Sequence, residues 1–259
     1  MLLVLDVGNT NTTLGLFDGA ELKHSWRLTS ERQRTVDEYG IMCLTLLQLA
    51  GLRPGLITEI VISSVVPPLD FTLNKMAEVY FEIKPLFIDA ANSGMPVLYD
   101  DPQEVGPDRI VNAVAAFARY GGPCVIVDFG TATTFDVISG AGEYLGGIIC
   151  PGIQISADAL FQRAARLRRI EIRQPSRVIG TNTTASVQSG LYYGNVGQVD
   201  GVIEQIIGEL GERPRVIATG GLAPLISKGS RHIEAVENDL TLEGMRLIYE
   251  RQAGGQSKG

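Results

Sequence analysis

The sequence predicts an α/β protein built from two similar halves, each with a β-sheet and flanking helices. An apolar run that ends in Asp, then Gly and hydroxyl-bearing residues, occurs twice, at 6–13 and at 128–134. After each copy, apolar runs of strand length alternate with helical patterns in the same order. The chain has 259 residues, which suffices for one large domain or two small ones.

The first half, 1–120, is expected to open with strands at 2–7, 13–18 and 22–28. Thr35 and Glu38 have the spacing of a capping box and predict a helix over 36–49, which Gly51 closes. The later elements of this half are expected to be a strand over 60–66, a helix from Pro67 to about Glu82, a strand over 86–88 and a helix over 110–117.

The second half, 121–252, comes after the turn at 120–123 and repeats this order. We expect strands at 124–129, 133–138 and 144–149, a helix after Pro151-Gly152, a longer helix over 185–210, a strand over 215–218, a helix opened by Gly220-Gly221, a strand over 233–236 and a final helix from Thr241. The tail 253–259 is small and polar, so we expect it to be disordered.

Composition excludes several classes of protein. The net charge of −7 disfavours non-specific nucleic-acid binding, which needs a basic face. Only three cysteines and two histidines occur, with no CxxC spacing, so a zinc site is not expected. Neither a signal peptide nor a membrane-spanning run is expected, so we predict a cytoplasmic protein. The basic cluster is read as a solvated helix end or a local anion contact: Arg163, Arg166, Arg168 and Arg169.

The long helix carries Gly190, Gly194, Gly197 and Gly201 near one face. Each glycine inside a helix costs about 1 kcal/mol relative to alanine, so a reason for them is needed. Internal helix packing and a subunit interface or substrate wall are equally good interpretations.

The repeated segments read Asp6-Val7-Gly8-Asn9-Thr10-Asn11-Thr12-Thr13 and Asp128-Phe129-Gly130-Thr131-Ala132-Thr133-Thr134. Glycine lets a phosphate approach the backbone, and the carboxylate can hold a cation or a metal-bound water. One copy alone would fit an ordinary tight turn. Two copies in matching settings favour a nucleotide held from both sides. No Walker lysine motif occurs, so backbone N–H groups, arginine and metal ions must meet the phosphate charge.

The segment Gly106-Pro107-Asp108-Arg109 precedes an apolar helix. Asp108 suits the positive end of the helix dipole, and its role there is either that of a cap or that of a general base beside an anion-binding arginine. Spacing alone favours the cap. The pair Gly220-Gly221 after Thr219 fits an adenosine or phosphate contact as well as an ordinary strand–helix turn.

Taken in order, these motifs resemble type III pantothenate kinase, over residues 1 to about 250. Gly180-Thr181-Asn182-Thr183 and Gln188-Ser189-Gly190 also fit that family's pattern. The resemblance implies two duplicated ribonuclease H-like (actin-like ATPase) domains, each a mixed sheet flanked by helices. It also implies a homodimer, with the substrate pocket near the subunit interface. Some relatives carry a lysine near Thr13, which this chain lacks.

The resemblance also implies roles for individual residues. ATP phosphates would contact Asp6, Val7, Gly8, Asn9, Thr10, Asn11, Thr12 and Thr13, and Asp6 would lie near Mg²⁺. Pantothenate would contact Tyr99, Gly106, Pro107, Asp108, Arg109 and Thr183. Asp108 would accept the proton of the pantothenate hydroxyl, Asp128 would bind a monovalent cation (K⁺ or NH₄⁺) and Thr131 would touch ATP.

The function implied is ATP-dependent phosphorylation of the primary hydroxyl of pantothenate, the first step of coenzyme A biosynthesis. Two alternatives stay open at this point. One is another small-molecule kinase of the same fold, such as a sugar kinase. The other is a nucleotide-binding regulatory accessory factor, although the presence of Asp6, Asp108 and Asp128 together favours catalysis.

Overall fold

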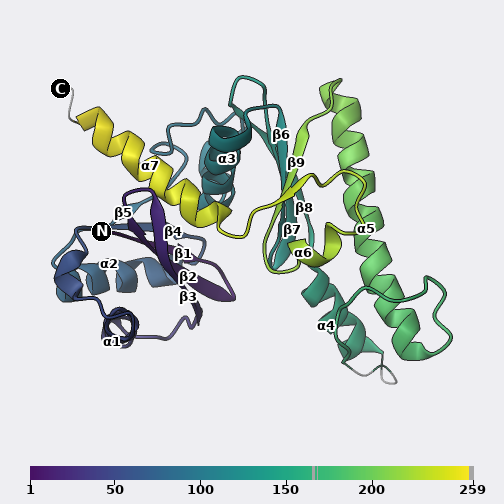
Figure 1. Ribbon diagram of the computed structural model, residues 1–259, viewed down its shortest axis with the longest axis horizontal. Helices are drawn as coiled ribbons and strands as arrows, with labels where there is room; N and C mark the ends of the chain where they lie inside the picture. Colours follow the sequence, from purple (N-terminus) through teal and green to yellow (C-terminus); the bar gives the residue numbers. More distant parts are fainter. Residues whose placement is uncertain (165–166, 168, 257–259) are drawn as a thin grey trace. The chain divides into compact units, whose positions relative to one another are not determined.

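The computed structural model describes residues 1–164, 167 and 169–256 (Figure 1). The chain forms two compact units, which we describe separately. The first unit comprises Met1–Ala118 and the C-terminal segment from Asp239, and the second comprises Arg119–Asn238.

The first unit contains a five-stranded mixed sheet in the order β3-β2-β1-β4-β5. Its strands are β1 Leu2–Val7, β2 Asn11–Asp18, β3 Glu21–Thr29, β4 Glu59–Ser64 and β5 Leu86–Phe87. The first three strands form an antiparallel meander, and β4 and β5 add in parallel. β1 is apolar on both faces because it lies in the middle of the sheet and both faces are covered.

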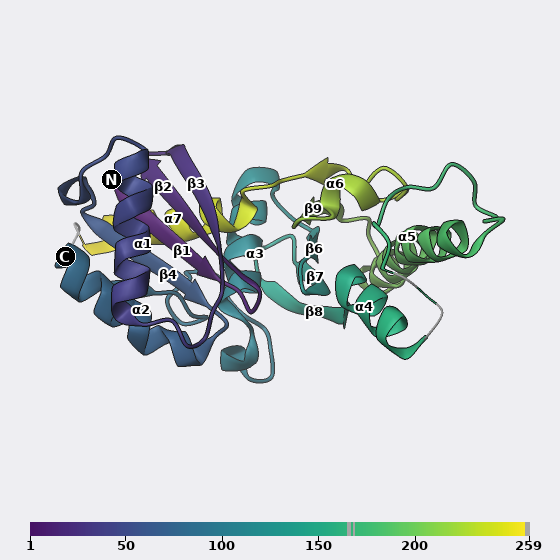
Figure 2. The same ribbon diagram turned by 90° about the horizontal axis from the view of Figure 1, so that it is seen from below.

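Helices cover the two faces of this sheet. The helices α1 (Val36–Leu49) and α2 (Pro67–Phe81) lie on one face, and α7 (Leu240–Gln256) lies on the other (Figures 1 and 2). The predicted capping box at Thr35 is present at the start of α1. The remaining segments are η1 (Pro54–Leu56), η2 (Pro102–Glu104) and α3 (Pro107–Tyr120), whose residues to Ala118 belong to this unit.

The second unit has the equivalent sheet order, β10-β9-β6-β7-β8. Its strands are β6 Cys124–Phe129, β7 Ala132–Ile138, β8 Tyr144–Pro151, β9 Arg215–Thr219 and β10 Ala235–Val236. Its helices are α4 Ile153–Arg163, α5 Thr183–Leu210 and α6 Ala223–Ile226. The apolar side of α5, including Tyr192, Val199 and Ile203, packs with Val125 and Val127 of β6 into one core. The predicted fold class, two similar α/β halves with mixed sheets, is confirmed.

The C-terminal segment differs from the prediction. The order of elements along the sequence places 239–252 in the second half, whereas the structure groups this segment with the first unit. The reason is packing: the side chain of Leu242 lies against Gly15 of β2, and Gly244 lies against the Val111 carbonyl of α3. Residues 253–256, expected to be disordered, continue α7, and 257–259 lie outside the described residues.

Two other predictions meet the structure in part. In the basic cluster, Arg163 ends α4 and Arg169 pairs with Asp158 at 2.8 Å, while Arg166 and Arg168 lie outside the described residues.

For the glycines of α5, a Cβ added at 190, 194, 197 or 201 would meet no atom within 4 Å. Packing against the described part of the chain therefore does not explain them. In the described part of the chain, no helix combines the length and the apolar character needed to cross a membrane.

Candidate functional site

The first turn connects β1 to β2 through residues 8–10. Pairing of the two strands sets Asp6 opposite Thr13 and Val7 opposite Thr12. The Gly8 N–H donates to the Asn11 carbonyl oxygen at 3.0 Å, and a Cβ on Gly8 would lie 3.1 Å from that oxygen. Glycine is thus the residue that fits this tight backbone approach.

A neighbouring loop, residues 30–35, is bonded to this turn. The Ser30 N–H donates to the Thr10 carbonyl at 3.0 Å, and the Ser30 and Thr12 hydroxyl oxygens are 2.8 Å apart. At the middle of the loop, Arg32 Nη2 donates to Asn9 Oδ1 at 3.2 Å. Sequence reasoning missed Ser30 and Arg32. The only signal that could have found them is the pairing of β2 with β3, which sets Asn11 opposite Thr29.

The second turn connects β6 to β7 through residues 130 and 131. The Gly130 N–H donates to the Ala132 carbonyl at 3.1 Å, as in the first turn, and Asp128 lies opposite Thr134. Parallel pairing of β6 with β9 brings Thr219 beside Asp128. A Cβ on Gly220 would lie 2.5 Å from Asp128 Oδ1 and 2.7 Å from the Phe129 carbonyl oxygen. Gly220, the first glycine of the pair noted in the sequence, therefore lies against the second turn, whereas a Cβ on Gly221 would meet nothing within 4 Å.

Asp108 lies in the first turn of α3, directly after Pro107. Its Oδ1 accepts a hydrogen bond from the Arg109 backbone N–H at 2.8 Å and would lie 2.5 Å from a Cβ on Gly106. Burial raises the pKa of the Asp108 carboxyl above its ordinary value, against the opposing effect of the Arg109 hydrogen bond and charge. The Arg109 side chain is itself buried. A carboxyl with a raised pKa near a helix start is compatible with both roles, cap and general base.

The start of α3 lies at the same end of the sheet as the first turn. A Cβ on Gly106 would lie 3.5 Å from Val65 Cγ1, and the Val65 N–H donates to the Val7 carbonyl at 3.0 Å. Val7 is the last residue of β1, so the aspartate-bearing turn and the Gly-Pro-Asp-Arg segment meet at the carboxyl ends of parallel strands. Ligands of open α/β sheets bind at such edges.

Tyr99 lies in the same unit, half-buried, on the segment that leads from β5 to η2. The start of this segment is anchored: Asp89 and Asn92 exchange backbone-to-side-chain hydrogen bonds of 3.0 and 2.9 Å. Gln252 of α7 then donates to the Asn92 carbonyl at 2.7 Å. The C-terminal helix therefore holds the segment that leads to Tyr99.

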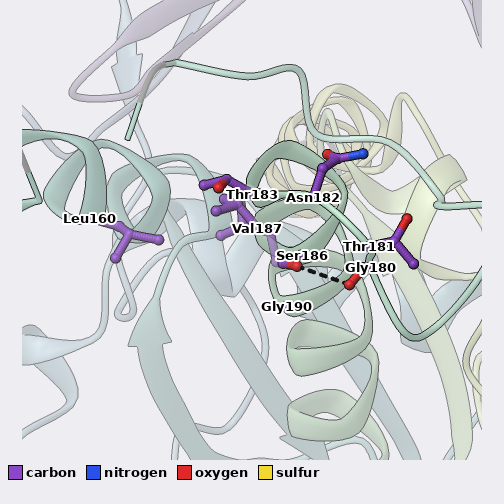
Figure 3. A pocket seen from close by; sticks show the side chains of 9 residues that line it. Leu160, Gly180, Thr181, Asn182, Thr183, Ser186, Val187 and Gly190 are labelled. Carbon is purple, nitrogen blue, oxygen red and sulfur yellow. Dashed lines mark hydrogen bonds between the residues drawn. The ribbon is translucent and has the colours of Figure 1, made fainter. Parts of the chain in front are cut away.

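Thr183 belongs to the second unit and borders a cavity of about 660 Å³ at the start of α5 (Figure 3). The cavity is lined by Leu160, Gly180, Thr181, Asn182, Thr183, Ser186, Val187, Gly190 and Leu191. Asn182 caps α5, with its Oδ1 accepting the Ala185 N–H at 2.9 Å. The Ser186 hydroxyl donates to the Gly180 carbonyl at 3.3 Å, the dashed line in Figure 3. Hydroxyl groups and a helix N-terminus suit an anionic or hydroxyl-bearing ligand.

Two comparisons with known proteins agree on one family. Residues 2–205 match the family model for type III pantothenate kinase. The chain is similar to the protein of that name from Koribacter versatilis, with 53% identity over 269 residues, covering 100% of this chain and 98% of the relative. The protein of the same name from Anaeromyxobacter sp. (strain K) is 57% identical over 252 residues, covering 97% of this chain and 99% of the relative.

Solved structures at low sequence identity show the fold alone. The activator of the 2-hydroxyisocaproyl-CoA dehydratase from Clostridium difficile, with bound ADPNP, has a TM-score of 0.60 at 11% identity, covering 100% of this chain and 97% of that chain. A ROK hexokinase from Thermus thermophilus has a TM-score of 0.54 at 14% identity, covering 98% and 99% of the two chains.

Proposed function

The chain belongs to the type III pantothenate kinase family, and we propose that it transfers the γ-phosphoryl group of ATP to the primary hydroxyl of pantothenate. The product is 4'-phosphopantothenate, formed in the first step of coenzyme A biosynthesis. The observation that carries the proposal is the meeting of the first turn with the Gly-Pro-Asp-Arg segment at the end of β1, through Val65 and Gly106.

Asp108 is the proton acceptor in this proposal. Its raised pKa, caused by burial, makes the carboxylate a stronger base than an exposed aspartate. It takes the hydroxyl proton of pantothenate as the oxygen attacks the γ-phosphorus in line, and the bond from that phosphorus to the bridging oxygen of ADP breaks. Positioning and electrostatic stabilisation supply the rest of the rate acceleration.

The segment from Asp6 to Thr13, which contains the first turn, would receive the phosphates through its backbone N–H groups and hydroxyls. Among the described residues no group of three metal-ligating side chains is present, and the turn offers the single carboxylate of Asp6. That donor set fits Mg²⁺, which binds through one or two carboxylates and the substrate phosphates and keeps several waters. Mg²⁺ would neutralise charge on the transferred phosphoryl group.

The second turn would hold a monovalent cation, K⁺ or NH₄⁺, and Thr131 would contact ATP. Support comes from Gly220, which lacks a Cβ and so lets Asp128 Oδ1 and the Phe129 carbonyl oxygen lie close together beside its backbone. A carboxylate and a carbonyl at one point form a cradle for a weakly hydrated cation. Such an ion would offset phosphate charge that Mg²⁺ leaves uncompensated.

Pantothenate itself carries a carboxylate and hydroxyl groups. We assign its contacts to Tyr99, Gly106, Pro107, Asp108, Arg109 and Thr183. The buried Arg109 guanidinium suits the carboxylate, and the donors at the start of α5 suit polar groups of the substrate. We also propose that the enzyme is a cytoplasmic homodimer. The open glycine face of α5, where an added Cβ meets nothing within 4 Å, supports close approach of a second subunit.

A radiolabelled ATP assay with pantothenate, sugars and acetate as acceptors tests the function. We expect label transfer to pantothenate at a rate well above that to any other acceptor. Preferred transfer to a sugar would identify another small-molecule kinase of this fold. No transfer to any acceptor, together with retained nucleotide binding, would identify a regulatory nucleotide-binding protein.

A further inference from the structure

We propose that Arg32 is a phosphate-binding residue of the first turn, which supplies the cationic side chain that this turn lacks. The inference rests on the proposed function, because it takes the ligand of the turn to be a nucleoside triphosphate. Residues 6–13 contain one carboxylate and no lysine or arginine, and the nearest cationic residue along the chain is Lys23. Residues 6–13 therefore offer phosphate charge only backbone N–H groups and neutral side chains, whose dipoles supply only partial charges.

The loop that carries Arg32 is fixed to the turn on one side. Ser30 makes two hydrogen bonds, to the Thr10 carbonyl at 3.0 Å and with the Thr12 hydroxyl at 2.8 Å. Thr12 is buried, so its contact with Ser30 joins the loop to the interior of the hairpin. These two hydrogen bonds therefore hold the base of the loop against the hairpin.

The other side of the loop is fixed by Arg34. Its Nη1 donates to the Thr29 carbonyl at 3.1 Å, and its guanidinium lies 5.2 Å from the centroid of the Tyr39 ring. Both contacts of Arg34 therefore stabilise the loop itself. Arg32, between the two anchors, instead reaches the exposed Asn9 at the tip of the turn, with 3.2 Å between Nη2 and Oδ1.

The charge of Arg32 is available to a ligand. The side chain is exposed, and none of the ion pairs found in the described part of the chain includes it. Its hydrogen bond is to a neutral amide, which uses one of five guanidinium N–H donors. A guanidinium prefers phosphate oxygens, which it can bind with two parallel hydrogen bonds. An incoming phosphate at the turn would therefore recruit Arg32 from Asn9.

Equilibrium binding of Mg²⁺-ATP and of adenosine, without pantothenate, tests the assignment in the full chain. We expect Arg32→Gln to raise the Kd for ATP roughly 5- to 30-fold, the range for an exposed charge-assisted contact. The Kd for adenosine should stay within about twofold, because adenosine lacks phosphates. Arg32→Lys should recover part of the ATP affinity through its point charge.

Arg53→Gln is the matched control. Arg53 is also exposed and lies in the first unit, but it precedes η1 and is outside the loop and the turn. Its replacement removes the same charge and should leave both Kd values unchanged. The ATP affinity of Arg32→Gln should also depend less on salt than that of the unsubstituted chain.

Two results would overturn the proposal. One is an ATP Kd for Arg32→Gln within twofold of the unsubstituted value. The other is an equal loss of ATP and adenosine affinity, which would show that Arg32 only shapes the turn through Asn9. Turnover of pantothenate is measured separately, so a chain that binds ATP without phosphorylating pantothenate would refute the proposed function and leave the role of Arg32 standing.

Discussion

The two aspartate-bearing turns occupy the same place in two equivalent sheets. They differ in their surroundings, which are rich in hydrogen-bond donors at one turn and in acceptors at the other. The first turn is bordered by donors: the Ser30 loop is bonded to it, and the Arg32 guanidinium reaches its tip. The second is bordered by acceptors, because Asp128 Oδ1 and the Phe129 carbonyl converge on Gly220, and the Thr131 carbonyl lies where a Cβ of Gly152 would be.

The difference arises in the segment directly after the third strand of each sheet. In the first unit β3 ends in a polar loop, and in the second β8 ends in Pro151 and Gly152, whose bare backbone closes on the turn. One duplicated hairpin is thus suited to an anion and the other to a cation. This contrast supports our proposal that the first turn binds phosphates and the second binds K⁺ or NH₄⁺.

The largest expected effect comes from Asp108, beside the first turn. Asp108→Asn should lower kcat by roughly 10²- to 10⁴-fold, because the hydroxyl proton loses its acceptor. Steady-state kinetics with pantothenate and ATP would measure this. Near-normal turnover would show that Asp108 serves only as a helix cap, since asparagine also caps helices well.

The stability of the same variant provides the control. Burial raises the pKa of the Asp108 carboxyl in the folded state, so folding is favoured by its protonated form. The contribution is greatest below the unfolded-state pKa and is lost as pH rises through the interval up to the folded-state pKa. At neutral pH the charged carboxylate therefore costs stability, and Asp108→Asn should melt at the same temperature or higher.

The pH dependence of turnover should track the same group. As pH falls through the raised pKa of Asp108, kcat/KM should decrease, because the base becomes protonated. The midpoint should lie above that of an ordinary exposed aspartate. A profile that stays flat down to the ordinary aspartate range would contradict the assignment.

An intermediate effect is expected at the second turn. Gly220 has a φ of +91° and no room for a Cβ beside Asp128, whereas a Cβ on Gly221 would meet nothing within 4 Å. Gly220→Ala should cost about 1–3 kcal/mol of stability and weaken the response of turnover to K⁺. Gly221→Ala is the matched control and should change neither. Thermal melting and a K⁺ titration of both variants would check this, and equal behaviour would remove the proposed role of Gly220.

The smallest effect is expected at Ser30, on the first turn. Ser30→Ala removes the hydroxyl contact with the buried Thr12, which should cost about 1 kcal/mol of stability. The ATP Kd should rise about two- to threefold, because the Arg32 loop loses one of the two hydrogen bonds through which Ser30 joins it to the hairpin. Denaturant unfolding and ATP binding would measure both changes. An unchanged ATP Kd would show that the backbone bond of Ser30 alone holds the loop.

Local patterns in the sequence were enough to predict much of this fold. The strands and helices repeat in order because each half must bury two faces of one sheet, and the capping box at Thr35 marks a helix start on its own. The place of α7 could not be predicted the same way. Its apolar residues require a partner, but only packing of Leu242 on Gly15 shows which sheet provides it.

The residues of the candidate site differ in the same way: a local motif predicts some of them, and only the folded structure reveals others. Asp6, Asp108 and Asp128 stand in recognisable motifs, because glycine and proline beside a carboxylate leave a local pattern. Arg32 lies far from its turn along the chain and meets it only through the register of β2 and β3. Such a contact has no motif, since it depends on how two strands align rather than on neighbouring residues.

The central claim is that the first turn binds phosphates and the second binds a monovalent cation. A titration with monovalent cations, applied to the matched pair Asp6→Asn and Asp128→Asn, tests it most directly. In buffer with Mg²⁺ and tetramethylammonium only, we predict little pantothenate phosphorylation by the unsubstituted chain, with recovery on adding K⁺ or NH₄⁺. Asp6→Asn should keep that response while requiring more Mg²⁺-ATP, and Asp128→Asn should lose it while staying folded. Full turnover without any small monovalent cation, or a K⁺ response lost in Asp6→Asn and kept in Asp128→Asn, would contradict the account.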